Sequence, residues 1–325
     1  MMIKPMNSNR ISVVTPTLRR PNEVVELLKN LSLQTFLPYE VILIDGAPLE
    51  ERETEKIVTG LIDHPYHLRY LRHGGGTAIQ RNVGIEHAEC NYIAFIDDDI
   101  RLETDFFDLI IKEYELDYEK QIGGITGYIT NQYLDPSTSR RWIWNRRLKL
   151  YTTFEPGRYD FESGYPVNRY LQAPHETMRR IDFMGAGCAV WRREVFDKGL
   201  RFSQFFTGLG VLEDVHLALR AQKDWKLYEC GSARCIHLHA LSGRENNRLV
   251  ARKTAINYRF VFVDIVPKRS INQELRFWRL QIIDLLRFIF YAVKNGKKQN
   301  WETVLGKMEG IFIAMCNVHK KRENA

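Results

Sequence analysis

Apolar runs typical of strands alternate with helical patterns from Ile11 to Asp97, and this alternation limits the possible folds more than any other feature. The strand-like runs are ISVVTP, YEVILID, HLRYLRH and NYIAFID. Between them, segments such as NEVVELLKNLSLQ and AIQRNVGIEHA place apolar residues at helical spacing. Strand–helix–strand units of this kind form right-handed crossovers, so we predict an α/β fold with a mixed, mostly parallel sheet flanked by helices.

The last quarter of the chain differs from the rest in charge. Residues 244–325 contain 17 Lys and Arg against 7 Asp and Glu, a net charge of +10, whereas residues 1–243 contain 30 against 33, a net charge of −3. The pattern after Gly243 is also helical. We therefore predict an α/β domain at 1–243, which would carry the active site, and a basic helical extension at 244–325.

Several protein classes are disfavoured by the sequence. The five cysteines have no CxxC spacing, which argues against a zinc site and a disulfide framework and favours a reducing compartment. The N-terminus lacks the apolar core of a signal peptide, and no apolar run reaches the roughly 18 residues of a membrane span. No nucleic-acid motif accompanies the positive charge. We expect a cytoplasmic protein, with peripheral attachment to the inner face of the membrane left open.

Three carboxylates, Asp97 to Asp99, directly follow the buried-type run YIAFI, and Asp45 ends another such run. In parallel sheets, ligands bind at the carboxyl ends of the strands. Two unit charges ~4 Å apart repel by roughly 4 kcal/mol at an effective dielectric near 20, so three adjacent carboxylates need solvent or a counter-charge. A turn or a helix cap is the ordinary role of a single aspartate at a strand end, but it explains three together poorly.

A divalent cation would supply that counter-charge. In an extended conformation Asp97 and Asp99 would share one face, with Asp98 on the other. Oxygen ligands in this arrangement suit Mg²⁺ or Mn²⁺, which keep several waters and also bind a diphosphate. Such an ion neutralises the charge that develops when a nucleoside diphosphate departs.

Five further segments follow one another along the chain: SVVTPTLRRPNEVVELLKNLSLQTFLPYEVILIDG, GTAIQRNVGIEHAECNYIAFIDDD, FMGAGCAVWRREVF, GVLEDVHLALR and ARCIHLH. Taken in this order, they resemble the motifs of GT-A glycosyltransferases, in particular family 2, the inverting enzymes that use nucleotide sugars. The resemblance covers roughly residues 11–242. It implies a Rossmann-like GT-A domain, a nucleoside-diphosphate sugar as donor, most simply a UDP-sugar, and Mn²⁺ or Mg²⁺ as cofactor.

The resemblance also implies roles for individual residues. Asp99 resembles the direct metal ligand of the DxD motif, and Asp97 belongs to the same metal-binding motif. The positions that resemble donor-binding residues are Thr15, Pro16, Arg19, Asp45, Arg81, Asp97 and Asp98. His237 and His239 lie where a histidine of the family completes the metal site, with a purely structural role as the alternative.

Glu213 and Asp214 resemble the acidic pair at the start of the acceptor-side helix, with Asp214 as general base. Inversion needs a base that takes the proton of the acceptor hydroxyl as its oxygen attacks the anomeric carbon. Helix capping by ordinary first-turn acids is the structural alternative.

Two departures from the family pattern are present: Gly46 follows Asp45 where a second acid is common, and the QxxRW motif of processive synthases is absent. We therefore expect a transferase that makes single additions.

The positively charged segments have two readings each. The stretch ELRFWRLQIIDLLRFIFYAVKNGKK predicts a helix that either lies in a membrane interface or packs on the catalytic domain or on another subunit. The stretch RRWIWNRRLKLY combines aromatic rings with arginines, which suits a lipid-diphosphate-linked or other anionic glycan acceptor or a loop that closes over the donor.

We expect an inverting glycosyltransferase of polysaccharide or glycolipid assembly, and two rivals remain. A phosphoryl-transfer enzyme of the haloacid-dehalogenase type also has an Asp-x-Asp after an apolar strand, although Ile100 and Arg101 follow here instead of Thr or Val. The second rival is a nucleotide-sugar-binding module without turnover. The donor sugar, the acceptor and the oligomeric state are not indicated by the sequence.

Overall fold

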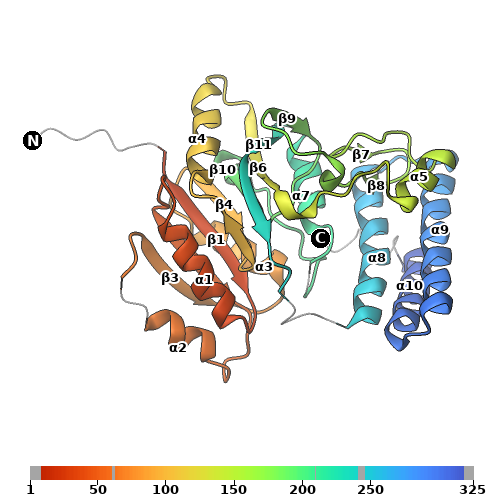
Figure 1. The fold of residues 1–325 in the computed structure, drawn as a ribbon, viewed down its shortest axis with the longest axis horizontal. Helices are drawn as coiled ribbons and strands as arrows, with labels where there is room; N and C mark the ends of the chain where they lie inside the picture. Colours follow the sequence, from red (N-terminus) through yellow and green to blue (C-terminus); the bar gives the residue numbers. More distant parts are fainter. Residues whose placement is uncertain (1–8, 61–62, 209, 241–245, 318–325) are drawn as a thin grey trace, which may run out of the picture. The chain divides into compact units, whose positions relative to one another are not determined.

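The computed structural model describes residues 9–60, 63–208, 210–240 and 246–317 (Figure 1). These described residues form two compact units, one within 1–133 and 172–243 and the other within 134–171 and 244–325. The predicted division at 243/244 stays a prediction. In the structure, residues 134–171 pack with the C-terminal helices, although the sequence analysis assigned them to the first part.

The first unit contains a sheet that has nine strands within the described residues. They are β1 (Ile11–Thr17), β2 (Glu40–Asp45), β3 (His67–Arg72), β4 (Tyr92–Ile96), β5 (Ile100–Leu102), β6 (Ile122–Ile129), β9 (Met178–Ile181), β10 (Cys188–Arg192) and β11 (Lys226–His237). Their order is β3-β2-β1-β4-β10-β6-β11-β5, with β9 paired to β11. Strands β5, β9 and β10 run against the other six. The predicted α/β fold with a mixed, mostly parallel sheet is confirmed.

Helices cover both faces of this sheet. They are α1 (Pro21–Ser32), α2 (Glu53–Thr59), α3 (Thr77–His87), α4 (Phe106–Leu116), α6 (Glu194–Asp197) and α7 (Glu213–Ala221), and the 3₁₀ helix η1 (Thr130–Gln132) follows β6. Because side chains alternate along a strand, Ile11 and Val13 of β1 pack in one core with the apolar faces of α1 and α4. Val14 points to the opposite face, toward α3.

The contact between α3 and β1 is unusually close. A Cβ at Gly84 of α3 would lie only 2.1 Å from Cγ1 of Val14, so no larger residue fits without displacing the helix. Strand β1 pairs in parallel with β2 and β4, which places Thr17 opposite Asp45 and brings the end of β4 to the same edge. The carboxyl ends of three strands and one face of α3 therefore meet.

The second unit is mainly helical. It contains α5 (Arg140–Arg147), the short strands β7 (Tyr159–Asp160) and β8 (Tyr165–Pro166), η2 (Arg169–Leu171), α8 (Asn247–Ile265), α9 (Ile271–Asn295) and α10 (Lys298–Asn317). Its core joins Trp142 and Tyr165 to Phe262 and Phe277, whose rings stack 5.1 Å apart. Ser270 begins α9 with a capping box, since its side chain and that of Gln273 satisfy each other's backbone N–H groups.

The predicted C-terminal helical extension is present in the described residues as α8, α9 and α10. None of the described helices combines the length and the apolar character needed to cross a membrane.

Candidate active site

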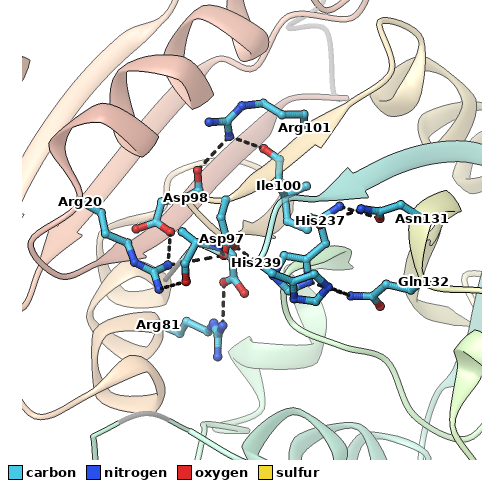
Figure 2. Close-up of polar contacts among 12 residues, drawn as sticks. Arg20, Arg81, Asp97, Asp98, Ile100, Arg101, Asn131, Gln132, His237 and His239 are labelled. Carbon is cyan, nitrogen blue, oxygen red and sulfur yellow. Dashed lines mark hydrogen bonds and ion pairs between the residues drawn. The ribbon is translucent and has the colours of Figure 1, made fainter. Parts of the chain in front are cut away.

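The acidic residues that follow β4 form a tight turn. The backbone N–H of Ile100 donates to the carbonyl oxygen of Asp97 over 3.1 Å, and β5 begins at once. The expectation that Asp97 and Asp99 would share one face of an extended segment is therefore wrong, because a turn aims successive side chains in different directions. The three carboxylates have three different sets of partners. Figure 2 labels Asp97 and Asp98 with their arginine partners.

Asp98 is buried against the first helix. Its Oδ1 lies 2.8 Å from a guanidinium nitrogen of Arg20, and its Oδ2 accepts a 2.7 Å hydrogen bond from Oγ1 of Thr17. Burial raises the pKa of Asp98 to about 6, against the opposing effects of Arg20 and Thr17. Arg20 also lies 3.6 Å from Asp99. A fixed cation thus supplies part of the counter-charge that the sequence analysis assigned to a metal ion.

Asp99 faces a histidine at the end of β11. Its Oδ1 lies 3.2 Å from Nε2 of His237, and its Oδ2 accepts a 3.0 Å hydrogen bond from the backbone N–H of Ala240. Burial disfavours the charged form of each group, but the hydrogen bond and the attraction between them have the larger combined effect. The pKa of Asp99 is therefore lowered and the pKa of His237 is raised.

A glutamine fixes both histidines (Figure 2). The amide nitrogen of Gln132 lies 2.9 Å from Nδ1 of His237 and 3.1 Å from Nε2 of His239, and the two imidazole rings stack 3.9 Å apart. In the tautomer that fits an amide N–H donating to Nδ1, the proton of His237 lies on Nε2 and faces Asp99. Asn131 exchanges two hydrogen bonds with the backbone of His237, of 2.8 and 3.0 Å.

Arg81 connects the acidic turn with the acidic pair of α7. Its guanidinium donates to Oδ1 of Asp97 and to Oε1 of Glu213, both over 2.8 Å, and the side chain is almost fully buried. Although burial opposes the charge, the two carboxylates hold the pKa of Arg81 above its usual value. One cation is therefore shared by two acids that are 116 positions apart in the sequence.

Asp214 has the most altered carboxyl group of the site. Leu212 precedes α7 in a left-handed conformation with φ 71°, which turns the chain so that Glu213 and Asp214 begin the helix. The carboxylate of Asp214 is enclosed although the residue keeps some exposure, and burial together with the charge of Glu213 raises its pKa to about 7. A carboxylate with a pKa near neutrality is suited to accept a proton.

The segment Gly185–Gly187 touches both acidic groups. The carbonyl oxygen of Gly187 accepts a 3.1 Å hydrogen bond from the backbone N–H of Asp97, and a Cβ at Gly187 would lie 2.9 Å from Oδ2 of Asp97. The backbone N–H of Ala186 donates to Oδ2 of Asp214 over 3.4 Å. The turn after β4 and the start of α7 therefore lie on either side of one glycine-containing segment.

The predicted donor-binding residues lie along the same sheet edge. Thr15 and Pro16 are buried near the end of β1, and Oγ1 of Thr15 has no hydrogen-bond partner among the described residues. Asp45 accepts from the hydroxyl of Tyr70 over 2.6 Å and from the backbone N–H of Ala47 over 2.8 Å. Arg19 instead points to the exposed surface, where it pairs with Glu51 over 2.6 Å.

The structure thus brings together Asp97, Asp98, Asp99, Arg81, Glu213, Asp214, His237 and His239, as the sequence analysis expected. It adds Arg20, Gln132, Asn131 and Gly187, which the sequence analysis missed. Within the described residues no group of three or more His, Cys, Asp or Glu side chains is arranged to enclose a metal ion.

Comparison with known proteins gives a family match. The family model described as glycosyl transferase family 2 matches residues 12–200. The glycosyltransferase YwdF of Bacillus subtilis is 23% identical over 235 residues, which is 72% of this chain and 76% of YwdF. The Bacillus subtilis protein TuaG, named a putative teichuronic acid biosynthesis glycosyltransferase, is 26% identical over 36% of this chain and 46% of its own length. A glycosyltransferase of Rickettsia conorii is 29% identical over 34% of this chain, but the match spans only 18% of that relative.

Two solved structures share the fold. GalNAc-T7 with UDP, GalNAc and Mn²⁺ superposes with a TM-score of 0.60 at 15% identity, covering 85% of this chain and 51% of that one. The mannosyltransferase PcManGT from Pyrobaculum calidifontis, in complex with GDP-Man and Mn²⁺, gives a TM-score of 0.56 at 14% identity, covering 96% and 91% of the two chains. The GT-A architecture expected from the sequence is confirmed.

Proposed function

The chain belongs to glycosyl transferase family 2, and we propose that it transfers a sugar, with inversion, from a nucleoside-diphosphate sugar to a glycan or glycolipid acceptor. The observation that carries this proposal is the meeting of the acidic turn, His237 and the Glu213–Asp214 pair at one sheet edge, with Arg81 bonded to both sides. Ligand sites in sheets of this kind lie at this edge.

Asp99 and His237 would hold the divalent cation. A carboxylate oxygen and an imidazole nitrogen that already face each other over 3.2 Å fit Mn²⁺ or Mg²⁺. For Nε2 of His237 to bind the cation its proton must move to Nδ1, and Gln132 would orient the ring in that state only after its amide turns so that the side-chain oxygen accepts from Nδ1. When bound, the cation neutralises the negative charge of the departing diphosphate. Asp97 and His239 remain proposed members of this site.

The residues of the chain supply the remaining requirements of transfer. Asp214 takes the proton of the acceptor hydroxyl, since its pKa of about 7 leaves a useful share of base at neutral pH. Glu213 stays buried beside Arg81 and keeps that pKa high. The proposed donor pocket consists of Thr15, Pro16, Arg19, Asp45, Arg81, Asp97 and Asp98, and a UDP-sugar is our first choice of donor.

The setting of the reaction is also a proposal. All five cysteines are free thiols, which fits a reducing compartment, so we place the protein in the cytoplasm. The acceptor would be a glycan or a lipid-linked intermediate of polysaccharide assembly, and the C-terminal basic helices would contact the inner face of the membrane.

Calorimetry with UDP-sugars, with and without Mn²⁺, tests the assignment. We expect Asp99→Ala and Asp214→Ala each to reduce transfer by at least about 100-fold, because each removes a group that acts in the transition state. Only Asp99→Ala should weaken the Mn²⁺-dependent part of donor binding. Equal loss of donor affinity in the two variants would refute the division of roles, and an aspartyl-phosphate trapped on the parent would favour phosphoryl transfer instead.

A further inference from the structure

Large apolar side chains lie exposed in a continuous stripe on each of the last two helices. On α9 the stripe consists of Ile271, Leu275, Ile282, Leu286 and Val293, with exposed Phe288, Phe290 and Tyr291 lying outside it, and on α10 it consists of Trp301, Leu305, Met308, Phe312 and Met315. The exposed fractions of the stripe residues range from 42% to 81%. Spacings of four and seven residues on α9, and of three and four on α10, keep each set on one side of its helix. We call these ten side chains the outer face.

Both stripes point away from α8. On α9, Phe277 and Leu280 are buried on the side where Phe277 stacks on Phe262 of α8, about half a turn of the helix from Leu275 and Ile282. On α10, the side that contains Gly306 meets α8, since a Cβ at Gly306 would lie 2.0 Å from the carbonyl oxygen of Arg248. Phe312 and Leu305 occupy the other side of α10.

The outer face is one surface because α9 and α10 also contact each other. Lys307 of α10 is buried and donates to the side-chain oxygen of Gln281 on α9. Ten large side chains exposed to this extent present on the order of 1,000 Å² of apolar area. The largest apolar patch on a typical monomer is about 300–600 Å², so this surface is large enough to indicate a binding partner.

The charge around the outer face is positive. Arg276, Arg279 and Lys294 are exposed on α9 beside the stripe, and Lys297 and Lys298 are exposed where the chain turns into α10.

Three of the four acidic side chains of α9 and α10 are held by internal ion pairs, and the fourth is Glu302, next to Trp301 in the sequence. Glu274 pairs with Arg259 and Arg269 over 2.7 Å, Asp284 pairs with Arg287 over 3.1 Å, and Glu309 pairs with Arg248. These acids therefore do little to offset the cations around the outer face.

We propose that the outer face docks on the surface of an anionic lipid bilayer, with α9 and α10 lying in the interface. The apolar stripes enter the boundary of the acyl chains while the bordering cations meet lipid phosphates. A second copy of the chain fits less well, because it would bring the same cations together across the interface. This docking rests on the membrane contact proposed above and assigns it to a defined surface, but it does not depend on the proposed reaction, since it uses neither the acidic turn nor α7.

Flotation of the full chain with vesicles tests the proposal. The parent should bind vesicles that contain phosphatidylglycerol and release them at high salt, and it should bind pure phosphatidylcholine vesicles much more weakly. Each cation near an anionic surface contributes about fivefold to partitioning, so Arg276→Gln with Lys294→Gln should weaken binding about 25-fold. Leu286→Ser with Phe312→Ser should weaken it at least as much, because both side chains would leave the lipid.

Matched substitutions outside the outer face serve as controls. Lys29→Gln with Lys120→Gln removes two exposed cations of the first unit, and Leu116→Ser with Tyr118→Ser removes two exposed apolar side chains there. Both controls should bind like the parent, and all variants should keep the parent's thermal midpoint. Equal binding to neutral and anionic vesicles, no binding to either, or unchanged binding by the outer-face variants would overturn the proposal. A dimer by light scattering that Leu286→Ser with Phe312→Ser converts to a monomer would assign the outer face to a second copy.

Discussion

Replacement of Asp214 by asparagine should make the protein more stable and less active at the same time. The pKa of Asp214 is raised from 3.8 to about 7 because the folded chain buries the carboxylate and places Glu213 beside it. This difference corresponds to a destabilisation of about 4 kcal/mol by the ionised carboxylate at high pH. Asparagine removes this destabilising charge, but it also removes one hydrogen-bond acceptor, which costs about 1 kcal/mol. Because the residue is partly exposed, the stabilisation gained by removing the charge is smaller still. We expect a net gain of about 2 kcal/mol.

The gain should depend on pH in a defined direction. Between about pH 4 and pH 7 the folded parent holds a proton at Asp214 more strongly than the unfolded chain does. The unfolding free energy of the parent therefore falls as the pH rises through this window, whereas that of Asp214→Asn lacks this contribution. The variant should gain about 3 °C in thermal midpoint at pH 8 and much less at pH 4.

Thermal unfolding at several pH values and a transfer assay on the same samples would check both effects. Asp197→Asn, which removes an exposed carboxylate from α6, is the control and should change stability by less than about 0.5 kcal/mol. Transfer by Asp214→Asn should fall at least about 100-fold, and transfer by the parent should rise with pH through about 7. A variant that is no more stable than the parent at pH 8 would refute the argument from burial, and a fully active one would refute the role as base.

Two further predictions concern the acidic turn. Arg20→Ala should lower the unfolding free energy by about 3 kcal/mol at pH 8, because it leaves Asp98 buried without its cation. Arg19→Ala breaks an exposed ion pair and should lower it by less than about 1 kcal/mol. Chemical denaturation measures both values, and similar losses for the two variants would contradict this assignment. Gly187→Ala should lower transfer about tenfold with little loss of stability, because its Cβ would lie 2.9 Å from Oδ2 of Asp97 and displace that side chain. Gly185→Ala, whose Cβ would lie 3.7 Å from Asp214, is the control and should keep near-parent activity. An unaffected Gly187→Ala enzyme would show that the position of Asp97 is not critical.

The sheet edge could be predicted from the sequence because its cause is local. Apolar runs of strand length end at Thr17, Asp45 and Asp97, and adjacent parallel strands bring such ends together. The acidic pair at Glu213 was different, since helix capping explained it equally well, and only the resemblance to a family gave it a role.

The partners within the site could not be predicted. Arg19 and Arg20 are adjacent and chemically alike, yet only Arg20 reaches Asp98. The backbone decides this, since Arg19 adopts a left-handed conformation with φ 55° that directs the two side chains apart. Asn131 and Gln132 were equally hidden, because nothing in a polar stretch after a strand indicates a contact with His237, more than 100 positions away.

The packing of the middle segment could not be predicted for a related reason. Trp142 and Tyr151 belong to RRWIWNRRLKLY, which was related to an acceptor or to a loop over the donor, but these two rings are buried in a core with Phe262 and Phe277. Aromatic residues in an irregular stretch indicate packing as readily as sugar binding, and the sequence does not show which distant residues complete the core.

Side chains of the chain itself neutralise part of the negative charge of the acidic turn before a ligand binds. Asp97 shares Arg81 with Glu213, and Asp98 has Arg20 and Thr17. Asp99 differs, because its closest side-chain partner is a histidine, which can release its proton, whereas an arginine keeps its charge at any physiological pH. A dication could therefore displace a proton at Asp99 and His237, but it would have to displace fixed cations at the other two carboxylates. This difference is the physical reason to place the first metal contacts at Asp99 and His237, while Asp97 and Asp98, besides their proposed contacts with the metal or the donor, also hold the turn in position.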